Sequence, residues 1–153
     1  MRIGTLRFLV AGTALSLCQL VSAGDLLVTL SLATPVLKRG EVPHFAVTVH
    51  STTRTVRVLR FQSRGDLRAN YAELRVTKDD ENAHVPVMIS DPGPIDEQAF
   101  VELKKGEELH FEHDGSPLVL SELPPGTYSA VLLLQPDARS EPIRSNEVTF
   151  RVQ

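Results

Sequence analysis

The sequence has little of what marks disulfide-rich or tryptophan-centred domains. Its 153 residues include one cysteine, no tryptophan, two tyrosines and six phenylalanines. The cysteine, Cys18, lies in an apolar stretch near the N-terminus, so the remaining chain can form no internal disulfide. The cysteine pair and tryptophan that form the core of antibody domains are therefore absent.

Sequence motifs of catalysis are also absent. The chain has no His-Glu-x-x-His helix motif, no Gly-x-Ser-x-Gly nucleophile motif, no phosphate-binding glycine loop and no spaced Cys/His set. The missing His-Glu-x-x-His motif excludes the metalloprotease centre built on it. We therefore expect a protein that is not an enzyme and needs no cofactor, and we assign no catalytic, cofactor-binding or metal-binding residue.

The N-terminal residues have the pattern of a secretory signal peptide. Arg2 and Arg7 supply positive charge, Phe8–Val21 is almost wholly apolar or small, and Val21-Ser22-Ala23 is a small-residue cleavage site. The apolar run is short for a membrane span. We predict a signal peptide over residues 1–23, cleavage before Gly24, and a mature domain over residues 24–153 in the periplasm or outside the cell.

Cys18 offers an alternative, because a lipoprotein also carries a cysteine after an apolar segment. A bacterial lipobox has a small residue before this cysteine, whereas Leu17 precedes Cys18, so we favour cleavage after Ala23. Loss of Arg2 and Arg7 with the leader lowers the net charge from −3 to −5. This charge disfavours nucleic acid and anionic lipid as partners. An exported chain without a disulfide or an Asn-x-Ser/Thr sequon fits a bacterial origin.

Alternating apolar and polar residues predict strands throughout the mature chain. Turn signals separate them, among them Lys38-Arg39-Gly40 in a connector over Pro35–Pro43, and Lys104–Glu107 as a hairpin turn. We expect a single all-β immunoglobulin-like sandwich of about seven to nine antiparallel strands. The expected strands are Asp25–Leu32, Phe45–His50, Val56–Phe61, Tyr71–Thr77, Val85–Ile89, Phe100–Leu103, Glu108–Glu112, Tyr128–Leu134 and Glu147–Val152.

The clearest local pattern runs from Leu123 to Gln135. Pro124-Pro125-Gly126 makes a turn, and an apolar run beginning at Tyr128 follows it. Alternate residues of this run form a core-facing stripe. Its members are Tyr128, Ala130, Leu132 and Leu134. A tyrosine that opens a late strand after such a turn predicts a tyrosine corner, with a buried ring and a hydroxyl bonded to nearby backbone.

Three segments together resemble known bacterial sandwiches. They read LSLATPVLKRGEVPHFAVTVHSTTRTVRVLRF, FVELKKGEELHFE and LPPGTYSAVLLL…SNEVTFRV. Their layout is similar to that of the bacterial intracellular proteinase inhibitors and of the β-sandwich portion of deuterolysin-type secreted proteases. The resemblance implies an immunoglobulin-like fold over nearly all of the mature chain. It also implies protease inhibition as a role, although an export signal differs from the setting of an intracellular inhibitor.

The densest group of potential metal ligands is His110-Phe111-Glu112-His113-Asp114. On a strand, His110 and Glu112 point the same way, roughly 6–7 Å apart. No spacing motif supplies a third ligand, so we favour a solvated strand end over a metal site. His44 and His50 lie roughly 20 Å apart along one strand, and we expect them to be separate surface histidines.

Two further patterns invite functional interpretation. The middle of the chain is locally basic. These charges could form a patch for an acidic partner, or they could be solvated charges that protect strand edges. We favour the second interpretation. The arginines are Arg54, Arg57, Arg60, Arg64, Arg68 and Arg75. Arg64-Gly65-Asp66 matches an adhesion tripeptide, but a match this short arises easily by chance and is also ordinary turn chemistry.

These features favour an exported, non-catalytic β-sandwich that binds another protein of the envelope or extracellular space. We expect no nucleic acid partner and no stable membrane span, and the oligomeric state stays open. The alternative is a secreted protease inhibitor that inserts an exposed loop into a protease cleft. The candidate loops are Gln62–Asn70 and Ser90–Gln98, the second of which Pro92 and Pro94 stiffen.

Overall fold

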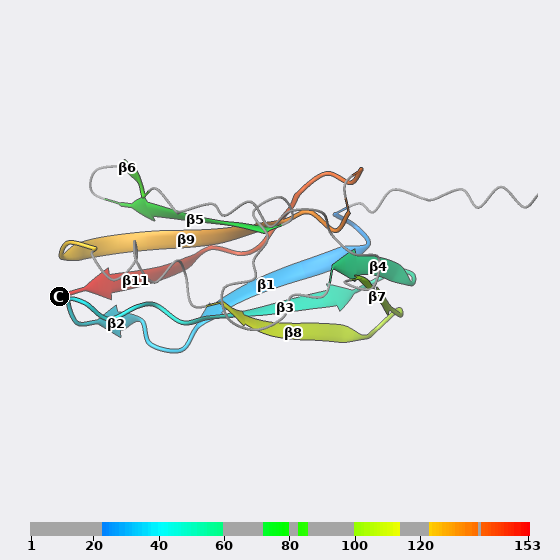
Figure 1. Cartoon of the computed structure of the whole chain (residues 1–153), viewed down its shortest axis with the longest axis horizontal. Coiled ribbons are helices and arrows are strands. Elements are labelled where there is room, and N and C mark those ends of the chain that lie inside the picture. The colour runs from blue at the N-terminus through cyan, green and yellow to red at the C-terminus, as the bar shows by residue number, and fades with distance from the viewer. Residues whose placement is uncertain (1–22, 60–71, 80–82, 86–99, 114–122, 138) are drawn as a thin grey trace, which may run out of the picture.

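A computed structural model describes residues 23–59, 72–79, 83–85, 100–113, 123–137 and 139–153 (Figure 1). These residues form strands and turns and contain no helix, which confirms the all-β prediction. Consequently, none of them lies in a helix long and apolar enough to cross a membrane. The strands are β1 (Leu26–Leu32), β2 (Val36–Leu37), β3 (Phe45–Ser51), β4 (Val56–Leu59), β5 (Ala72–Lys78), β6 (Ala83–Val85), β7 (Phe100–Leu103), β8 (Glu108–His113), β9 (Gly126–Leu134), β10 (Ile143–Arg144) and β11 (Val148–Val152).

Two sheets face each other (Figure 1). The three-stranded sheet has the order β1-β3-β8, with both pairs antiparallel. The six-stranded sheet has the order β2-β11-β9-β5-β6, and β10 pairs with the far end of β9. The longest strand, β9, is central in this sheet because it pairs with both β5 and β11.

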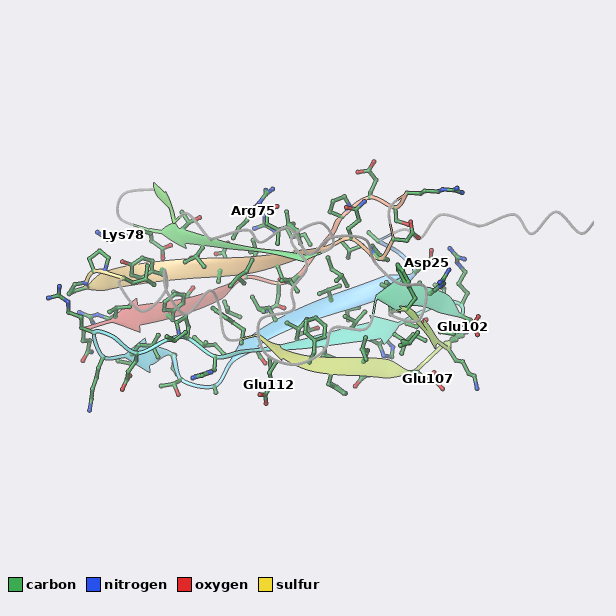
Figure 2. All side chains as sticks on the ribbon, viewed as in Figure 1. Asp25, Arg75, Lys78, Glu102, Glu107 and Glu112 are labelled. Carbon is green, nitrogen blue, oxygen red and sulfur yellow. The ribbon has the colours of Figure 1, made fainter. Side chains whose placement is uncertain are left out.

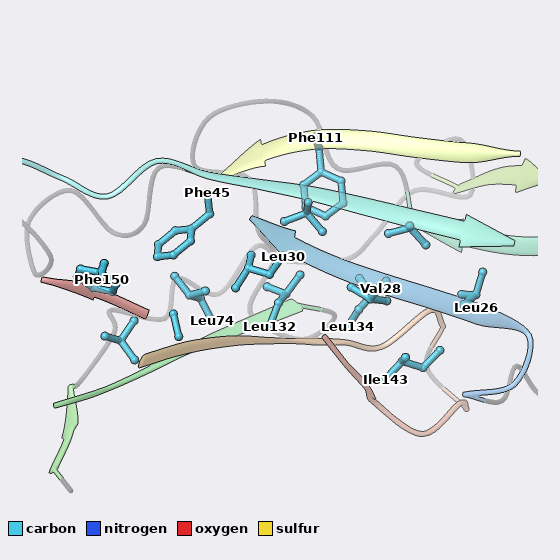
Figure 3. Close-up of a cluster of buried hydrophobic side chains, with 14 of the residues drawn as sticks. Leu26, Val28, Leu30, Phe45, Leu74, Phe111, Leu132, Leu134, Ile143 and Phe150 are labelled. Carbon is cyan, nitrogen blue, oxygen red and sulfur yellow. The ribbon is translucent and has the colours of Figure 1, made fainter. Parts of the chain in front are cut away.

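The inner residues of both sheets form one hydrophobic core (Figure 3). Strict alternation along β1 and β3 places leucine, valine and phenylalanine inward, as the sequence predicted. Phe150 lies between two other rings: its centroid is 5.4 Å from that of Tyr128, in a stacked pair, and 6.1 Å from that of Phe45, in an edge-to-face pair. Phe45 comes from the three-stranded sheet, so this aromatic group joins the two layers.

The predicted stripe on β9 is confirmed. Tyr128, Ala130, Leu132 and Leu134 are all buried. The Tyr128 hydroxyl donates a hydrogen bond to the Pro124 carbonyl over 2.7 Å. Tyr128 is therefore held at both ends, by the aromatic stack and by the turn that precedes it.

The predicted hairpin around Lys104–Glu107 is wrong. The turn itself forms, with the Glu107 N–H donating to the Lys104 carbonyl and Gly106 at φ 84°. The flanking strands do not pair with each other, however, since β7 pairs with β4 and β8 pairs with β3. β3 continues into β4, and its partner β8 follows directly on β7, so the two pairs form one long antiparallel ribbon. Both sides of this ribbon change direction at the turn.

An unequal residue count marks that change of direction. His50 opposes Glu108 and Val56 opposes Leu103, so six steps on one chain match five on the other. One additional residue on one side is the geometry of a β-bulge, which bends a strand. Ser51 bridges the bend, because its N–H donates to the Glu107 carbonyl and its carbonyl accepts from the Gly106 N–H.

Other expectations also need correction. The Pro35–Pro43 segment is not only a connector: it contains β2, which pairs in parallel with β11. Eleven strands occur in the described residues, and three of them are only two or three residues long. The predicted number of about seven to nine strands was therefore too low, because it left out these short strands. The expected Val85–Ile89 strand begins earlier, as β6, and its residues 86–89 lie outside the described residues.

Asn146 connects the two layers at the edge of β1. Its Oδ1 accepts from the Leu30 N–H over 2.7 Å, and its Nδ2 donates to the Leu30 carbonyl over 2.9 Å. The amide thus takes the place of a neighbouring strand at that position. An unpaired strand edge is a site for unwanted pairing, and this contact protects it.

Candidate binding surfaces

Two polar side chains of the histidine-rich segment, those of His110 and Glu112, lie on the outer face of the three-stranded sheet. In the β3–β8 register, His110 opposes Thr48 and Glu112 opposes Ala46. His110 and Glu112 do share one face, as the strand periodicity predicted. The side chain of His113 and all of Asp114 lie outside the described residues. Figure 2 shows Glu112 projecting from this outer face.

The contacts of His110 involve residues that the sequence did not group with it. Its Nε2 lies 3.2 Å from Glu108 Oε2, and its Nδ1 lies 3.0 Å from Thr48 Oγ1. The Nδ1 of His50 lies 3.4 Å from the other oxygen of the same carboxylate, Oε1. Glu108 thus lies between two imidazoles. We call His50, Glu108 and His110 the histidine pair cluster.

Solvent reaches all three members of the histidine pair cluster. The side chains of His50, Glu108 and His110 are 33%, 47% and 65% exposed. Nevertheless, His50 Nδ1 itself is shielded and has no hydrogen-bond partner of good geometry among the described residues. In their present conformations, no three His, Cys, Asp or Glu side chains in the described ranges are placed to hold a metal ion.

His44 and His50 lie apart, as predicted, but His50 also contacts Glu108, a residue that the sequence did not group with it. Pairing of β3 with β8 brings His50 beside a sequence segment about sixty residues away, and the outer-face alternation orients it toward Glu108. His44, which precedes β3, is not part of this group. Only the strand partners, which a single sequence does not name, could have indicated the contact.

The described arginines of the basic segment do not form one patch. Arg54, in the turn after β3, binds Asp25 through Nε and Nη2 at 3.1 and 3.0 Å. Arg57 on β4 lies 4.5 Å from the ring centroid of Phe100. Arg75, on β5 of the other sheet, binds Glu73 at 2.8 and 3.0 Å.

Each of these arginines has a structural contact, which fits the preferred interpretation of solvated or edge-located charge. Hydrogen bonding to Asp25 raises the pKa of Arg54 above its ordinary value, and hydrogen bonding to Glu73 does the same for Arg75. Both guanidinium groups therefore stay charged at any physiological pH. The other three arginines, the Arg64-Gly65-Asp66 tripeptide and both candidate inhibitory loops lie outside the described residues.

A second candidate surface lies on the outer face of the six-stranded sheet, where Figure 2 shows Arg75. A shallow depression of about 330 Å³ has Val131 and Ser129 of β9 at its floor. Arg75 stands on one side, and Arg144 on the other lies 3.6 Å from Glu147. We call this the arginine depression; its lining residues are Arg75, Thr77, Asp79, Ser129, Val131, Arg144 and Glu147.

The sequence identified Arg75 as one of several arginines, but it did not predict that Arg75 lies across β9 from Arg144. β5 and β10 both pair with β9. Leu133 of β9 lies opposite Glu73 of β5 on one side and opposite Arg144 of β10 on the other. This arrangement places the two arginines on either side of the same central strand. Val131 is 6% exposed although it faces outward, because the long side chains around it cover it.

Comparison with known proteins finds similarity in structure alone. No family model matches the sequence, and no curated protein matches it. A β-glucosidase from Listeria innocua in complex with glucose is 15% identical, with a TM-score of 0.46, and the match covers 84% of this chain and 16% of that one. Pseudomonas fluorescens alkylpurine DNA glycosylase AlkC, bound to DNA with an abasic site analog, is 12% identical, with a TM-score of 0.48 and coverages of 85% and 31%.

A third solved structure, AvmM, which catalyses macrocyclization in alchivemycin A biosynthesis, is 13% identical, with a TM-score of 0.40 and coverages of 84% and 89%. This chain spans less than a third of the length of the first two proteins. All three TM-scores are below 0.5, so none of these likenesses bears on the function of this chain.

Proposed function

We propose that this protein is an exported immunoglobulin-like domain that binds another protein of the envelope or extracellular space and has no catalytic role. The strand order supports the fold assignment. β1, β3 and β8 occupy the places of strands A, B and E in one immunoglobulin sheet, and β5, β9 and β11 those of C, F and G in the other. The bond from Tyr128 to Pro124 occurs at the start of the F-equivalent strand, as in a tyrosine corner.

The arginine depression is the observation that carries the binding role. Arg75 is held in place by two bonds to Glu73, so little side-chain entropy is lost when a partner meets it. The hydroxyls of Ser129 and Thr77 and the surrounding charged side chains give the surface a polar lining, and Val131 beneath them is nearly covered. The arginine depression, with a volume of about 330 Å³, suits one side chain of a partner better than a large ligand. A polar partner side chain that bonds to the paired charges around Arg75 and Arg144 fits this surface.

A comparative pull-down tests the role of this surface. Envelope proteins captured by the wild-type chain are compared with those captured by the Arg75→Glu/Arg144→Glu double variant and by the Lys105→Glu control, which changes an exposed residue in the β7–β8 turn. We expect a specific partner that the double variant loses and the control retains. Equal capture by all three proteins would reject the arginine depression as the binding surface.

The inhibitor alternative predicts a different result. A secreted protease inhibitor would slow at least one protease of a broad panel stoichiometrically, and replacement of Ser90–Gln98 would abolish that inhibition without lowering the melting temperature. Because loops contribute little to a core, such a replacement leaves stability nearly unchanged. Our proposal expects no inhibition beyond substrate competition.

Export is tested by the N-terminus of the processed protein. The pattern of Arg2, Arg7 and the site at Ala23 predicts that secreted or periplasmic material begins at Gly24. N-terminal sequencing should find this residue first. A lipid-modified Cys18, or an intact Met1 in cytoplasmic material only, would contradict export by signal peptidase cleavage.

A further inference from the structure

We propose that the contacts around Asp25 control proteolytic processing: the bond between Ala23 and Gly24 is cut before the domain folds, and the folded domain protects it. The proposal rests on the export proposed above, which places the cleavage site at this bond. β1 begins at Leu26, the third residue after the bond, and a turn over Ala23, Gly24 and Asp25 precedes it. Figure 2 shows Asp25 at the end of the molecule where β4 lies. The cleavage site therefore directly adjoins the folded sheet.

Three consecutive residues between β3 and β4 hold the two residues that follow the bond. The Thr52 hydroxyl donates to the Gly24 carbonyl over 2.7 Å, and the Thr52 N–H donates to the Asp25 carbonyl over 2.9 Å. The Thr53 hydroxyl donates to Asp25 Oδ1 over 2.6 Å. We call Gly24, Asp25, Thr52, Thr53 and Arg54 the N-terminal clasp.

Arg54 makes the charged contact of the N-terminal clasp. Its Nε donates to Asp25 Oδ1 over 3.1 Å and its Nη2 donates to Oδ2 over 3.0 Å, so the guanidinium and the carboxylate meet at two points. The Asp25 side chain is only 14% exposed, so water competes little for these bonds. The Ser51 hydroxyl donates to the Arg54 carbonyl and fixes the backbone of the turn. The clasp is therefore a built anchor, unlike an exposed ion pair on flexible side chains.

A peptidase needs the chain on both sides of the bond in an extended form, which it can pair with its own backbone. Gly24 and Asp25 cannot take that form while both carbonyls and the carboxylate are bound to the turn after β3. The folded chain must therefore open locally before it is cut, and the rate of cleavage follows the population of the open form. Hydrolysis then adds one water across the peptide bond and leaves a carboxylate on Ala23 and an amine on Gly24.

Purified bacterial signal peptidase, acting in detergent on the full folded chain, tests the proposal. The reference substrate is a synthetic peptide of residues 1–30, which contains the cleavage site but not the turn after β3. Gel mobility follows the cleavage, and N-terminal sequencing identifies the bond that is cut. We expect cleavage of the peptide before Gly24, and cleavage of the folded chain at least about tenfold more slowly, because several hydrogen bonds must open first.

Arg54→Ala is the decisive variant, because it breaks the clasp without changing the sequence around the cleaved bond. It should speed cleavage of the folded chain by about tenfold, the effect of losing hydrogen bonds to a charged group. Arg54→Lys keeps the charge but not the two-point geometry, so its rate should be intermediate. A thermal melt of each variant shows that it is folded at the assay temperature.

Tyr128→Phe is the matched control, because it removes a hydrogen bond in the other sheet and leaves the clasp intact. Its rate of cleavage should stay close to that of the unchanged chain. Cleavage as fast as in Arg54→Ala would show that processing follows global unfolding, which would overturn the role of the clasp.

Two other results would also overturn the proposal: equal rates for the folded chain and the peptide, or an unchanged rate in Arg54→Ala. A failure of the export proposal looks different, since the peptide itself would then not be cut before Gly24. That result would remove the basis of both proposals.

Discussion

The inner and outer faces of the three-stranded sheet use alternate residues of the same strands, yet different interactions organise them. The inner row of Leu30, Val47 and Phe111 is buried in the core shared by both layers. The outer row of the same strands carries hydroxyls, imidazoles and carboxylates that contact one another in solvent. Because strand side chains alternate with period two, one face stabilises the fold while the other is free to carry binding chemistry.

The largest expected difference between the two faces is at the aromatic group. Phe45→Ala removes the ring that packs edge-to-face on Phe150 and should lower the free energy of unfolding by about 3–5 kcal/mol. Ala46→Ser, on the adjacent but exposed position, should change it by less than about 0.5 kcal/mol. Urea denaturation of both variants measures the contrast. Similar losses would mean that the two faces of β3 do not differ as described.

Tyr128→Phe isolates one polar contact within the core. The ring remains in its stack on Phe150, but the hydroxyl bond to the Pro124 carbonyl is lost. We expect a loss of about 1–3 kcal/mol, since a partly buried hydrogen bond is lost and the Pro124 carbonyl is left without the hydroxyl that bonded to it. Chemical denaturation provides the value. A change within experimental error would show that the turn does not depend on the hydroxyl.

Asn146→Ala tests the connection between the layers at the edge of β1. Both bonds to the Leu30 backbone disappear, and we expect a loss of about 1–2 kcal/mol, as two net hydrogen bonds contribute. Asn146→Asp keeps the acceptor for the Leu30 N–H but sets a carboxylate oxygen against the Leu30 carbonyl, so it should be at least as destabilising as Asn146→Ala. An Asp variant as stable as the unchanged chain would argue against the described geometry.

Glu108→Gln should have the smallest effect on stability. The side chain is about half exposed, and pairs between exposed charges typically contribute little, so we expect a change below about 0.5 kcal/mol. Thermal melts of the Glu108→Gln variant and of the unchanged chain measure the difference. A large loss of stability would give this face a structural role.

Much of the fold could be predicted from local patterns. Alternation identified the main strands and the core-facing stripe of Tyr128, Ala130, Leu132 and Leu134, all of which are buried. The turn at Pro124–Gly126 indicated the buried position of Tyr128. These features depend on residues that are close in the chain, where backbone geometry alone relates neighbouring side chains.

The partners of those strands could not be predicted in the same way. A tight turn at Lys104–Glu107 normally joins two paired strands, but β7 and β8 instead pair with β4 and β3. Likewise, β2 is too short to give a periodic signal and exists because β11 supplies its hydrogen bonds. The local sequence contains the turn, whereas the pairing depends on which sheet gains more burial.

The sequence by itself determined an all-β chain, the burial pattern of its long strands and the Tyr128 turn, because each follows from the spacing of neighbouring residues. Only the tertiary structure decided that His50 meets Glu108 and His110, and that Arg75 and Arg144 stand on either side of β9. Strand pairing joins segments tens of residues apart, and the register of each pair selects which side chains share a face. Both candidate binding surfaces are products of that register.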